Sequence, residues 1–90
     1  MCESWDSTVL KDIETVLNRV IPETEKYTYT SEGKDGMPAY AKNCLVGVSL
    51  TIPISKGSLQ MGTWQGIWLC EHKNSGGSRN LVITLTGISN

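Results

Sequence analysis

The sequence has little of what several classes of protein depend on. Among its 90 residues, eight basic and nine acidic side chains give a net charge of -1. No basic run is dense enough to bind phosphate backbones by releasing counterions, so we expect no nucleic acid among the partners. No apolar stretch approaches the roughly 20 residues needed to cross a bilayer, so we expect no membrane association either.

Cysteine is also scarce. Cys2, Cys44 and Cys70 form an odd and widely spaced set, which fits neither a disulfide framework nor a paired zinc motif. This usage indicates a reducing compartment. The polar start, Met1 to Asp6, lacks the basic and apolar regions of a signal peptide. Together these features predict a cytoplasmic protein.

An amphipathic pattern follows this polar start. Apolar residues recur every three or four positions, at Val9, Leu10, Ile13, Val16, Leu17, Val20 and Ile21. This spacing predicts an α-helix from about Ser7 to Val20. Asp6 or Ser7 can cap the free N–H groups at its start, and Pro22 ends it because proline cannot continue a helix.

A polar, glycine-bearing stretch comes next. Residues 23–35 show no convincing period and predict a loop, with a short extended piece around residues 27–29. Loops of this length often carry function. Residues 37–43 predict a short helix, because Pro38 falls in its first turn, where the missing N–H costs nothing.

Three extended segments complete the chain. Residues 46–54 alternate in the period-two pattern of a strand with one buried face, and residues 59–71 and 79–88 predict two more strands. Lys56-Gly57 supplies a turn, and residues 72–78 predict a flexible hairpin loop. These features predict an α+β fold, in which an antiparallel meander of three strands is covered by one main α-helix. A single domain over residues 1–90 follows.

One block of the second strand is more specific than ordinary strand composition. Residues 62–71 read Gly-Thr-Trp-Gln-Gly-Ile-Trp-Leu-Cys-Glu, after Ser-Leu-Thr-Ile-Pro-Ile at 49–54 and Met-Pro-Ala at 37–39. Together these blocks resemble the YjbQ-like family, whose members are often labelled secondary thiamine-phosphate synthases. The resemblance spans essentially all 90 residues, and the ending at residues 68–72 looks most like the plant branch. It implies a YjbQ-like sandwich, a homotrimer and a small phosphorylated ligand.

The chain also departs from the family pattern. Family members are typically longer, and the resemblance implies that this chain begins inside the domain, without their N-terminal strands and the histidine there. Tyr29 and Tyr40 stand where the family has histidine, and Cys2 replaces an asparagine beside the retained Glu3. Phenol neither shuttles protons near neutral pH nor readily binds a metal. We therefore expect no metal and no cofactor, although the family's histidines are suited to a metal.

The resemblance assigns roles to seven residues of this chain. It implies catalytic roles for Glu3, Asp35 and Gln65. It implies that a substrate would contact Thr63, Trp64, Tyr29 and Tyr40. No residue is expected to bind a metal, since the only histidine, His72, lies in a loop beside glycines.

Several of these residues also have a purely structural interpretation. Trp64 shares a strand face with Trp68, which is more typical of a packed core or a subunit contact than of a stacking wall for a planar ring. Gln65 and Thr63 would need hydrogen-bond partners if buried, and the backbone can supply them as well as a ligand can. Asp35 lies in a Gly-Lys-Asp-Gly turn, where aspartate is common for local reasons.

Two functions stay open at this point. The resemblance implies an enzyme that condenses pyrimidine and thiazole phosphates to thiamine phosphate. The alternative is a non-catalytic, truncated module for oligomerisation or partner binding, in which the family's histidines are lost. Unpaired sheet edges and apolar surface tend to recruit another chain, which favours the second function.

Overall fold

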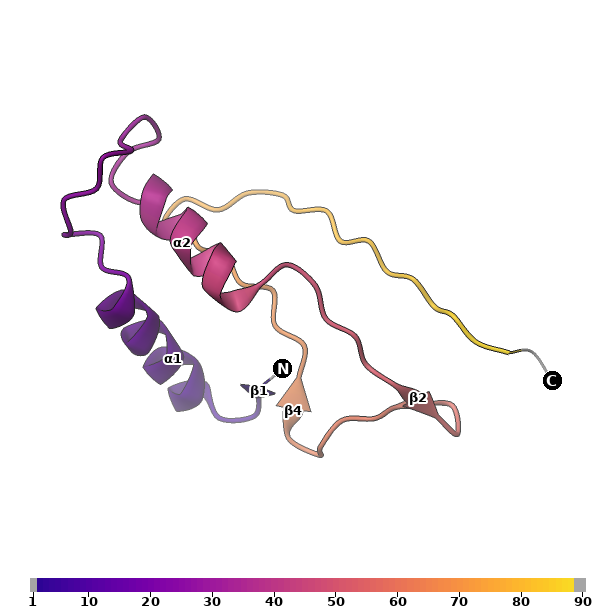
Figure 1. The fold of residues 1–90 in the computed structure, drawn as a ribbon. Coiled ribbons are helices and arrows are strands. Elements are labelled where there is room, and N and C mark those ends of the chain that lie inside the picture. The colour runs from indigo at the N-terminus through magenta and orange to yellow at the C-terminus, as the bar shows by residue number, and fades with distance from the viewer. Residues whose placement is uncertain (1, 89–90) are drawn as a thin grey trace.

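The computed structural model describes residues 2–88 and has the predicted α+β composition (Figure 1). Two helices come early in the chain, and the strands are very short. The elements in chain order are β1 (Cys2–Glu3), α1 (Ser7–Val20), α2 (Gly36–Val46), β2 (Ile54–Ser55), β3 (Ser58–Leu59) and β4 (Gln65–Gly66).

The first helix has the predicted bounds. Asp6 is its N-cap, and the Asp6 carboxylate accepts hydrogen bonds from the backbone N–H of Thr8 at 2.9 Å and from the Thr8 hydroxyl at 2.7 Å. At the other end, Ile21 leaves the helical conformation before Pro22, as a residue that precedes proline tends to do. The sequence prediction for this helix is therefore confirmed at both ends.

The second helix is longer than predicted. Pro38 lies in its first turn as expected and is fully buried, but the helix continues through Val46, which the alternating pattern had assigned to a strand. It ends where Gly47 adopts a φ of 89°, a conformation that glycine reaches without a Cβ clash. The Gly47 N–H donates to the Asn43 carbonyl at 2.8 Å, which satisfies one carbonyl of the last turn.

The strands form two small antiparallel sheets. In one sheet β1 pairs with β4, so that Cys2 lies opposite Gly66 and Glu3 opposite Gln65. In the other, β2 and β3 form a hairpin around Lys56 and Gly57. Both of these turn residues have positive φ values, 53° and 77°, as a type I′ turn requires. The predicted turn is confirmed.

The predicted meander of three strands under one helix is not confirmed. The structure has two helices and two two-stranded sheets in its place. Residues 79–88 are extended, but they make no backbone hydrogen bond with any described residue. The alternating pattern identifies an extended segment correctly, but a ladder also needs a neighbouring backbone, and periodicity carries no information about which neighbour that is.

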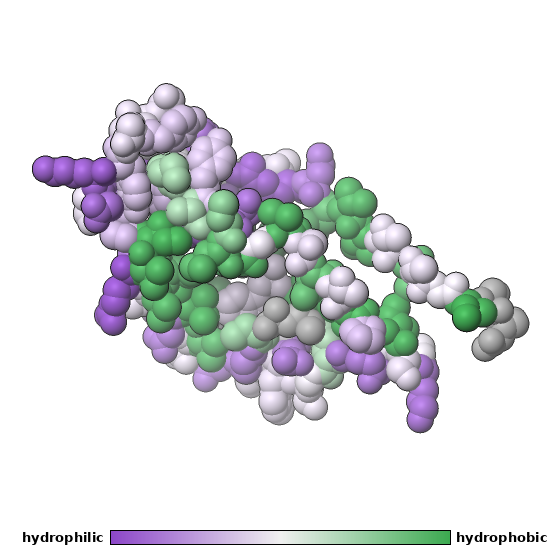
Figure 2. All heavy atoms as spheres, viewed as in Figure 1, coloured by the Kyte–Doolittle hydropathy of each residue, from purple (hydrophilic) through white to green (hydrophobic). Residues whose placement is uncertain are grey.

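The small buried region lies at the start of α2. Its buried residues are Gly36, Pro38, Ala39 and Lys42, whereas α1 has no buried residue. The two helices run side by side in opposite directions (Figure 1), and the Lys42 Nζ donates to the Asn18 Oδ1 at 2.7 Å between them. Figure 2 shows hydrophobic residues over the helical part of the visible face and along the C-terminal trace. Much apolar side chain is therefore in contact with water.

Neither helix in the described part of the chain has the length and apolarity that crossing a membrane requires.

Candidate functional site

Two of the predicted ligand-binding residues meet at the start of α2. The rings of Tyr29 and Tyr40 pack edge to face, with centroids 5.9 Å apart and planes at 61°. The Tyr29 hydroxyl donates to the Glu32 carboxylate at 2.7 Å. With Asp35 and Lys73 these residues form what we call the tyrosine cluster. The sequence did not predict that the two tyrosines share one location.

The loop of residues 72–78 completes the tyrosine cluster from a distant part of the chain. The Lys73 Nζ lies 3.7 Å from the Glu32 Oε1 and 3.9 Å from the Asp35 Oδ1. The backbone N–H of Asn74 donates to the Asp35 Oδ2 at 2.8 Å, and the Asn74 amide donates to Glu23 at 2.7 Å. Asp35 is the N-cap of α2 by position, yet its side chain makes no cap hydrogen bond and holds this loop instead.

The hydrogen bonds of the tyrosine cluster shift its ionisation. The hydrogen bond to Glu32 raises the pKa of Tyr29 to about 12, and Glu32 also raises the pKa of Tyr40. The hydrogen bonds from Tyr40 and Tyr29 lower the pKa of Glu32, and the backbone N–H of Asn74 lowers that of Asp35. At neutral pH both phenols are therefore protonated donors, and both carboxylates are charged.

Four other predicted residues lie together at β1 and β4. Glu3 and Gln65 are opposite each other in the ladder, and Thr63 and Trp64 immediately precede Gln65. The ring of Trp5 packs on that of Trp64, with centroids 5.3 Å apart and planes at 53°. We call these five residues the tryptophan cluster. Trp5 is 78% exposed and Trp64 is 55% exposed, so this pair does not form a buried core.

Two of the predicted catalytic side chains already have local structural partners. One Glu3 oxygen accepts a hydrogen bond from the backbone N–H of Trp5 at 2.8 Å, and the other accepts one from that of Asp6 at 3.1 Å. The Gln65 carbonyl oxygen accepts the N–H of Gly62 at 2.6 Å and closes the turn before β4. These bonds organise the approach to α1 and to β4. They support the structural interpretation of Gln65.

The seven predicted residues do not form one site. The tryptophan cluster adjoins the N-terminus of α1, whereas the tyrosine cluster follows the loop beyond its C-terminus (Figure 1). The 14 residues of α1 span roughly 21 Å at the standard rise of an α-helix. A single small ligand bound to this chain cannot contact both clusters.

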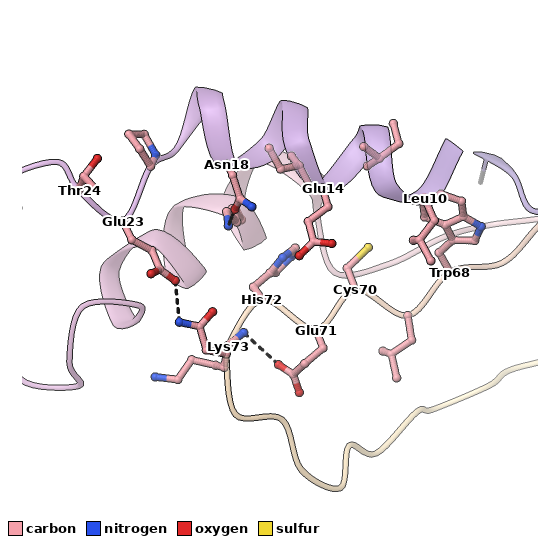
Figure 3. A pocket seen from close by; sticks show the side chains of 16 residues that line it. Leu10, Glu14, Asn18, Glu23, Thr24, Trp68, Cys70, Glu71, His72 and Lys73 are labelled. Carbon is pink, nitrogen blue, oxygen red and sulfur yellow. Dashed lines mark hydrogen bonds between the residues drawn. The ribbon is translucent and has the colours of Figure 1, made fainter. Parts of the chain in front are cut away.

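A groove of about 770 Å³ lies between α1 and residues 68–74. The side chains of Trp68, Cys70 and His72 point toward α1, with Trp68 beside Leu10, whereas Glu71 points away from α1 (Figure 3). None of the seven predicted residues lines this groove. Its alternating side chains show that residues 68–72 keep the strand periodicity that the sequence predicted, although no ladder forms there.

His72, the single histidine, lies in this groove in an unfavourable place for a positive charge. Its partial burial lowers the pKa of the imidazole, and the nearby ammonium of Lys42 lowers it further. Within residues 2–88, no three histidine, cysteine, aspartate or glutamate side chains are grouped closely enough to hold a metal ion. The His72 imidazole is one of several polar side chains of the groove, together with Asn18 and Lys42.

Sequence comparison now decides the family. The family model described as UPF0047 protein YjbQ-like matches residues 1–88. The chain belongs to this family. It is 46% identical over 85 residues to the UPF0047 protein YjbQ of Escherichia coli O157:H7, a match that covers 94% of this chain and 62% of that protein. It is 36% identical over 86 residues to a UPF0047 protein of Synechocystis sp., covering 94% and 58%.

The chain thus spans less than two thirds of the length of these relatives. A UPF0047 protein of Methanocaldococcus jannaschii is 39% identical over 69 residues, covering 77% of this chain and 48% of the relative. No solved structure matches the chain. The predicted family membership is confirmed, and the names of these relatives state no reaction.

Proposed function

We propose that this chain is a non-catalytic association module of the YjbQ-like family, which works in a homotrimer in the cytoplasm. The observation that carries this proposal is the exposure of large apolar side chains on both helical and extended segments, with no buried residue in α1. Exposed apolar side chains in this number are typical of an interface that another polypeptide covers. Burying these side chains in an interface stabilises the assembly by about 25 cal/mol for each Å² of apolar area removed from water.

The separation of the two clusters supports the same proposal. The aromatic rings of each cluster are exposed to solvent, and each cluster presents only part of the predicted set of site residues. In a trimer, the tyrosine cluster of one protomer and the tryptophan cluster of another can face one ligand, although α1 keeps them apart within one chain. Glu3, Gln65 and Asp35 then act mainly by holding local structure, as their hydrogen bonds indicate.

Analytical ultracentrifugation of the purified chain at micromolar concentration tests the module. We expect sedimentation at three times the mass of the chain, 9.9 kDa, with dissociation on dilution. Leu10→Lys and Ile13→Lys place charges on the exposed apolar face of α1 and should weaken the association. Lys11→Gln, on the same helix, is the matched control. A folded monomer at every concentration refutes the proposal.

The tyrosine cluster favours a second candidate, the thiamine-phosphate chemistry that the resemblance implies. Two neutral phenols and the Lys73 ammonium converge there. The ammonium can donate to a phosphate oxygen directly, whereas each phenol can do so by exchanging its hydrogen bond to Glu32 for one to the phosphate. In this function the site is shared by two protomers: Tyr29 and Tyr40 of one bind the phosphate, Thr63 and Trp64 of the other bind the ring, and Glu3, Asp35 and Gln65 position the reacting groups. The reaction joins pyrimidine and thiazole phosphates and displaces phosphate.

The two candidates predict different results with the two precursors. The enzyme forms thiamine phosphate from them above a buffer control, and Lys73→Ala lowers the rate at least tenfold while Lys26→Ala leaves it unchanged. The module forms no product. Calorimetry with inorganic phosphate provides a second readout, since binding that is lost in Lys73→Ala but retained in Lys26→Ala supports a phosphate site even without turnover.

A further inference from the structure

Within residues 2–88, Lys42 is the only charged side chain that is buried. It is 8% exposed, and it lines the groove between α1 and residues 68–74. Its Nζ donates to the Asn18 Oδ1 at 2.7 Å, which uses one of the three donors of an ammonium. No carboxylate of the described chain forms an ion pair with it. Because a buried charge is costly without an opposite charge beside it, this ammonium favours an anion in the groove.

Two neutral side chains bring further donors to the same place. An ammonium can only donate, so the Asn18 oxygen faces Lys42 and the Asn18 amide nitrogen keeps its two N–H groups for another acceptor. The His72 imidazole is half-buried, and burial and then Lys42 lower its pKa, so near neutral pH it is uncharged and keeps one N–H. Figure 3 shows Asn18 pointing from α1 into the groove and His72 pointing toward α1.

The two ends of the groove differ in chemistry. Leu10, Ile13 and Trp68 line it along the first half of α1, and Trp68 lies beside Leu10 (Figure 3). Asn18 and Lys42 line it near the C-terminal end of α1. Its volume of about 770 Å³ is within the range of small-molecule sites, roughly 300–1,000 Å³. An apolar wall beside a few converging donors is the usual composition of such sites.

The acidic side chains around the groove limit the charge of a ligand. Glu23 accepts a hydrogen bond from the Asn74 amide at 2.7 Å, and Glu71 points away from α1. Glu14 precedes Asn18 by one helical turn, about 6 Å along the axis. These carboxylates repel a dianion such as phosphate more strongly than they repel a monoanion. One ammonium and two neutral donors therefore match a single carboxylate group.

We propose that this groove binds a small organic carboxylate with an apolar tail, whose oxygens accept hydrogen bonds from Lys42, Asn18 and His72. The carboxylate pairs with the buried ammonium, and the tail lies along the apolar wall at Leu10 and Trp68. The site belongs to neither the tyrosine cluster nor the tryptophan cluster, since none of the seven predicted residues lines the groove. It therefore stands or falls separately from the proposed association and from the thiamine-phosphate chemistry.

Calorimetry of the full chain with phenylacetate as the probe tests this proposal. Phenylacetate carries one carboxylate on a short aromatic tail, and phenylacetamide has nearly the same shape without the charge. We expect saturable binding of phenylacetate, binding of phenylacetamide at least tenfold weaker, and no displacement of phenylacetate by an equal concentration of inorganic phosphate. The nuclear magnetic resonance signals of the His72 imidazole should shift over the same range of phenylacetate concentration, which places the probe in the groove.

Three results would overturn the proposal at this stage. The first is the absence of saturable phenylacetate binding. The second is equal affinity for phenylacetate and phenylacetamide, which would mean that the buried ammonium does not select for charge. The third is displacement by phosphate, which would mean that the site takes any oxyanion and not a carboxylate.

Two substitutions separate the charge from the shape of the groove. Lys42→Met keeps an unbranched side chain without the ammonium and should weaken phenylacetate binding at least tenfold. Asn18→Asp places a carboxylate where the amide oxygen now meets Lys42, so the chain supplies its own counter-charge and binding should fall by a similar factor. Lys26→Met changes a lysine outside the groove and should leave the affinity unchanged.

Thermal unfolding shows whether these losses come from the site or from damage to the fold. Asn18→Asp should unfold at a temperature no lower than that of the unchanged chain, because it pairs a buried charge. A lower unfolding temperature in Asn18→Asp would mean that Lys42 does not favour an anion, and would overturn the proposal. Retained phenylacetate affinity in either Lys42→Met or Asn18→Asp would overturn it as well. Sedimentation and product formation, which test the proposed function, do not depend on these results.

Discussion

The helical region, residues 7–46, and the extended region, residues 47–88, differ in where their backbone hydrogen bonds go. Each helix satisfies most of its N–H and C=O groups internally, and its ends are fixed by Asp6, Pro22 and Gly47. The extended region has only the β2–β3 hairpin as an internal ladder. Its other paired element, β4, depends on β1 from the opposite end of the chain.

This difference shows how far local interactions can define the fold. A helix bonds residues four positions apart, whereas a strand must find a neighbour at any distance along the chain. The two regions meet at the β1–β4 ladder and at the contacts of Lys73 and Asn74 with the loop before α2. If the comparison is right, changes at these junctions affect both regions, and changes inside a helix stay local.

The largest effect is expected from Gly66→Ala, at the ladder that joins the two regions. A Cβ on Gly66 would lie 2.7 Å from the Ser4 Cβ, so β1 and β4 must separate to admit it. We expect the free energy of unfolding to fall by about 2 kcal/mol, as overpacking commonly costs. Urea unfolding, monitored by circular dichroism, measures this free energy. Gly77→Ala is the control, because a Cβ there meets no atom within 4 Å. An equal loss of stability in Gly77→Ala would contradict the role assigned to the β1–β4 ladder.

A smaller and local effect is expected from Asp6→Ala. Loss of the cap bonds to Thr8 should lower amide protection in the first turn of α1 roughly fivefold and leave the β2–β3 hairpin unchanged. The Thr8 hydroxyl and then its backbone N–H lower the pKa of Asp6. This stabilisation is therefore complete above the ordinary aspartate pKa and is lost as pH falls through the folded value.

Hydrogen exchange at several pH values tests the cap. Asp12→Ala removes another carboxylate of α1 and serves as the control, since the Asp12 carboxylate accepts no hydrogen bond within the described residues. If Asp12→Ala weakens the first turn as much as Asp6→Ala does, charge near the helix start, and not the cap, explains the effect.

A third effect is expected in the tyrosine cluster, where Glu32 controls the pKa of Tyr29. The hydrogen bond from Tyr29 to Glu32 raises the pKa of Tyr29 to about 12, so Glu32→Gln should return it toward about 10. Absorbance at alkaline pH measures phenolate formation. The hydrogen bond from Tyr29 to Glu32 contributes its full stabilisation of the folded state below the ordinary tyrosine pKa. This contribution is lost as pH rises through the pKa of Tyr29 in the folded protein.

Lys73→Ala should shift the titration of Tyr29 much less than Glu32→Gln does, because the phenol is bonded directly to Glu32 and the lysine acts on it only through its ion pair with that carboxylate. A lower Tyr29 pKa in Glu25→Gln, a carboxylate outside the cluster, would contradict the assigned cause. A large shift in Lys73→Ala would show that the loop of residues 72–78 orders the cluster.

The smallest effect is expected at His72, across the groove. Burial first, and then the Lys42 ammonium, lower the pKa of His72. Lys42→Met removes the second cause, so the pKa should rise but stay below its ordinary value. Nuclear magnetic resonance titration of the imidazole measures it, with Lys26→Met as a control that should not change it.

The sign of the pH effect at His72 follows from this lowered pKa. The folded protein favours the neutral imidazole, so its contribution to stability is complete above about pH 6.5 and is lost as pH falls through the folded pKa. A His72 pKa that is unchanged in Lys42→Met would mean that the α2 ammonium does not act across the groove.

Sequence reasoning predicted the local part of the site and missed the distant part. The resemblance singled out Tyr29, Tyr40 and Asp35, but no pattern in the sequence places the loop of Lys73 and Asn74 beside them. Trp5 was missed as a partner of Trp64, because the two residues lie far apart in the sequence. Contacts between residues that are far apart in sequence leave no periodic signal.

By itself, the sequence determined the family, the bounds of α1 and the presence of a turn at Lys56-Gly57. Each of these depends on residue identities or on bonds between near neighbours. Only the tertiary structure decided that α2 continues to Val46, that the site residues form two clusters, and that residues 79–88 stand without a ladder. Strand pairing and site assembly depend on contacts between segments that are far apart in the chain. The free energy of such contacts depends on both segments, so no single stretch of sequence determines it.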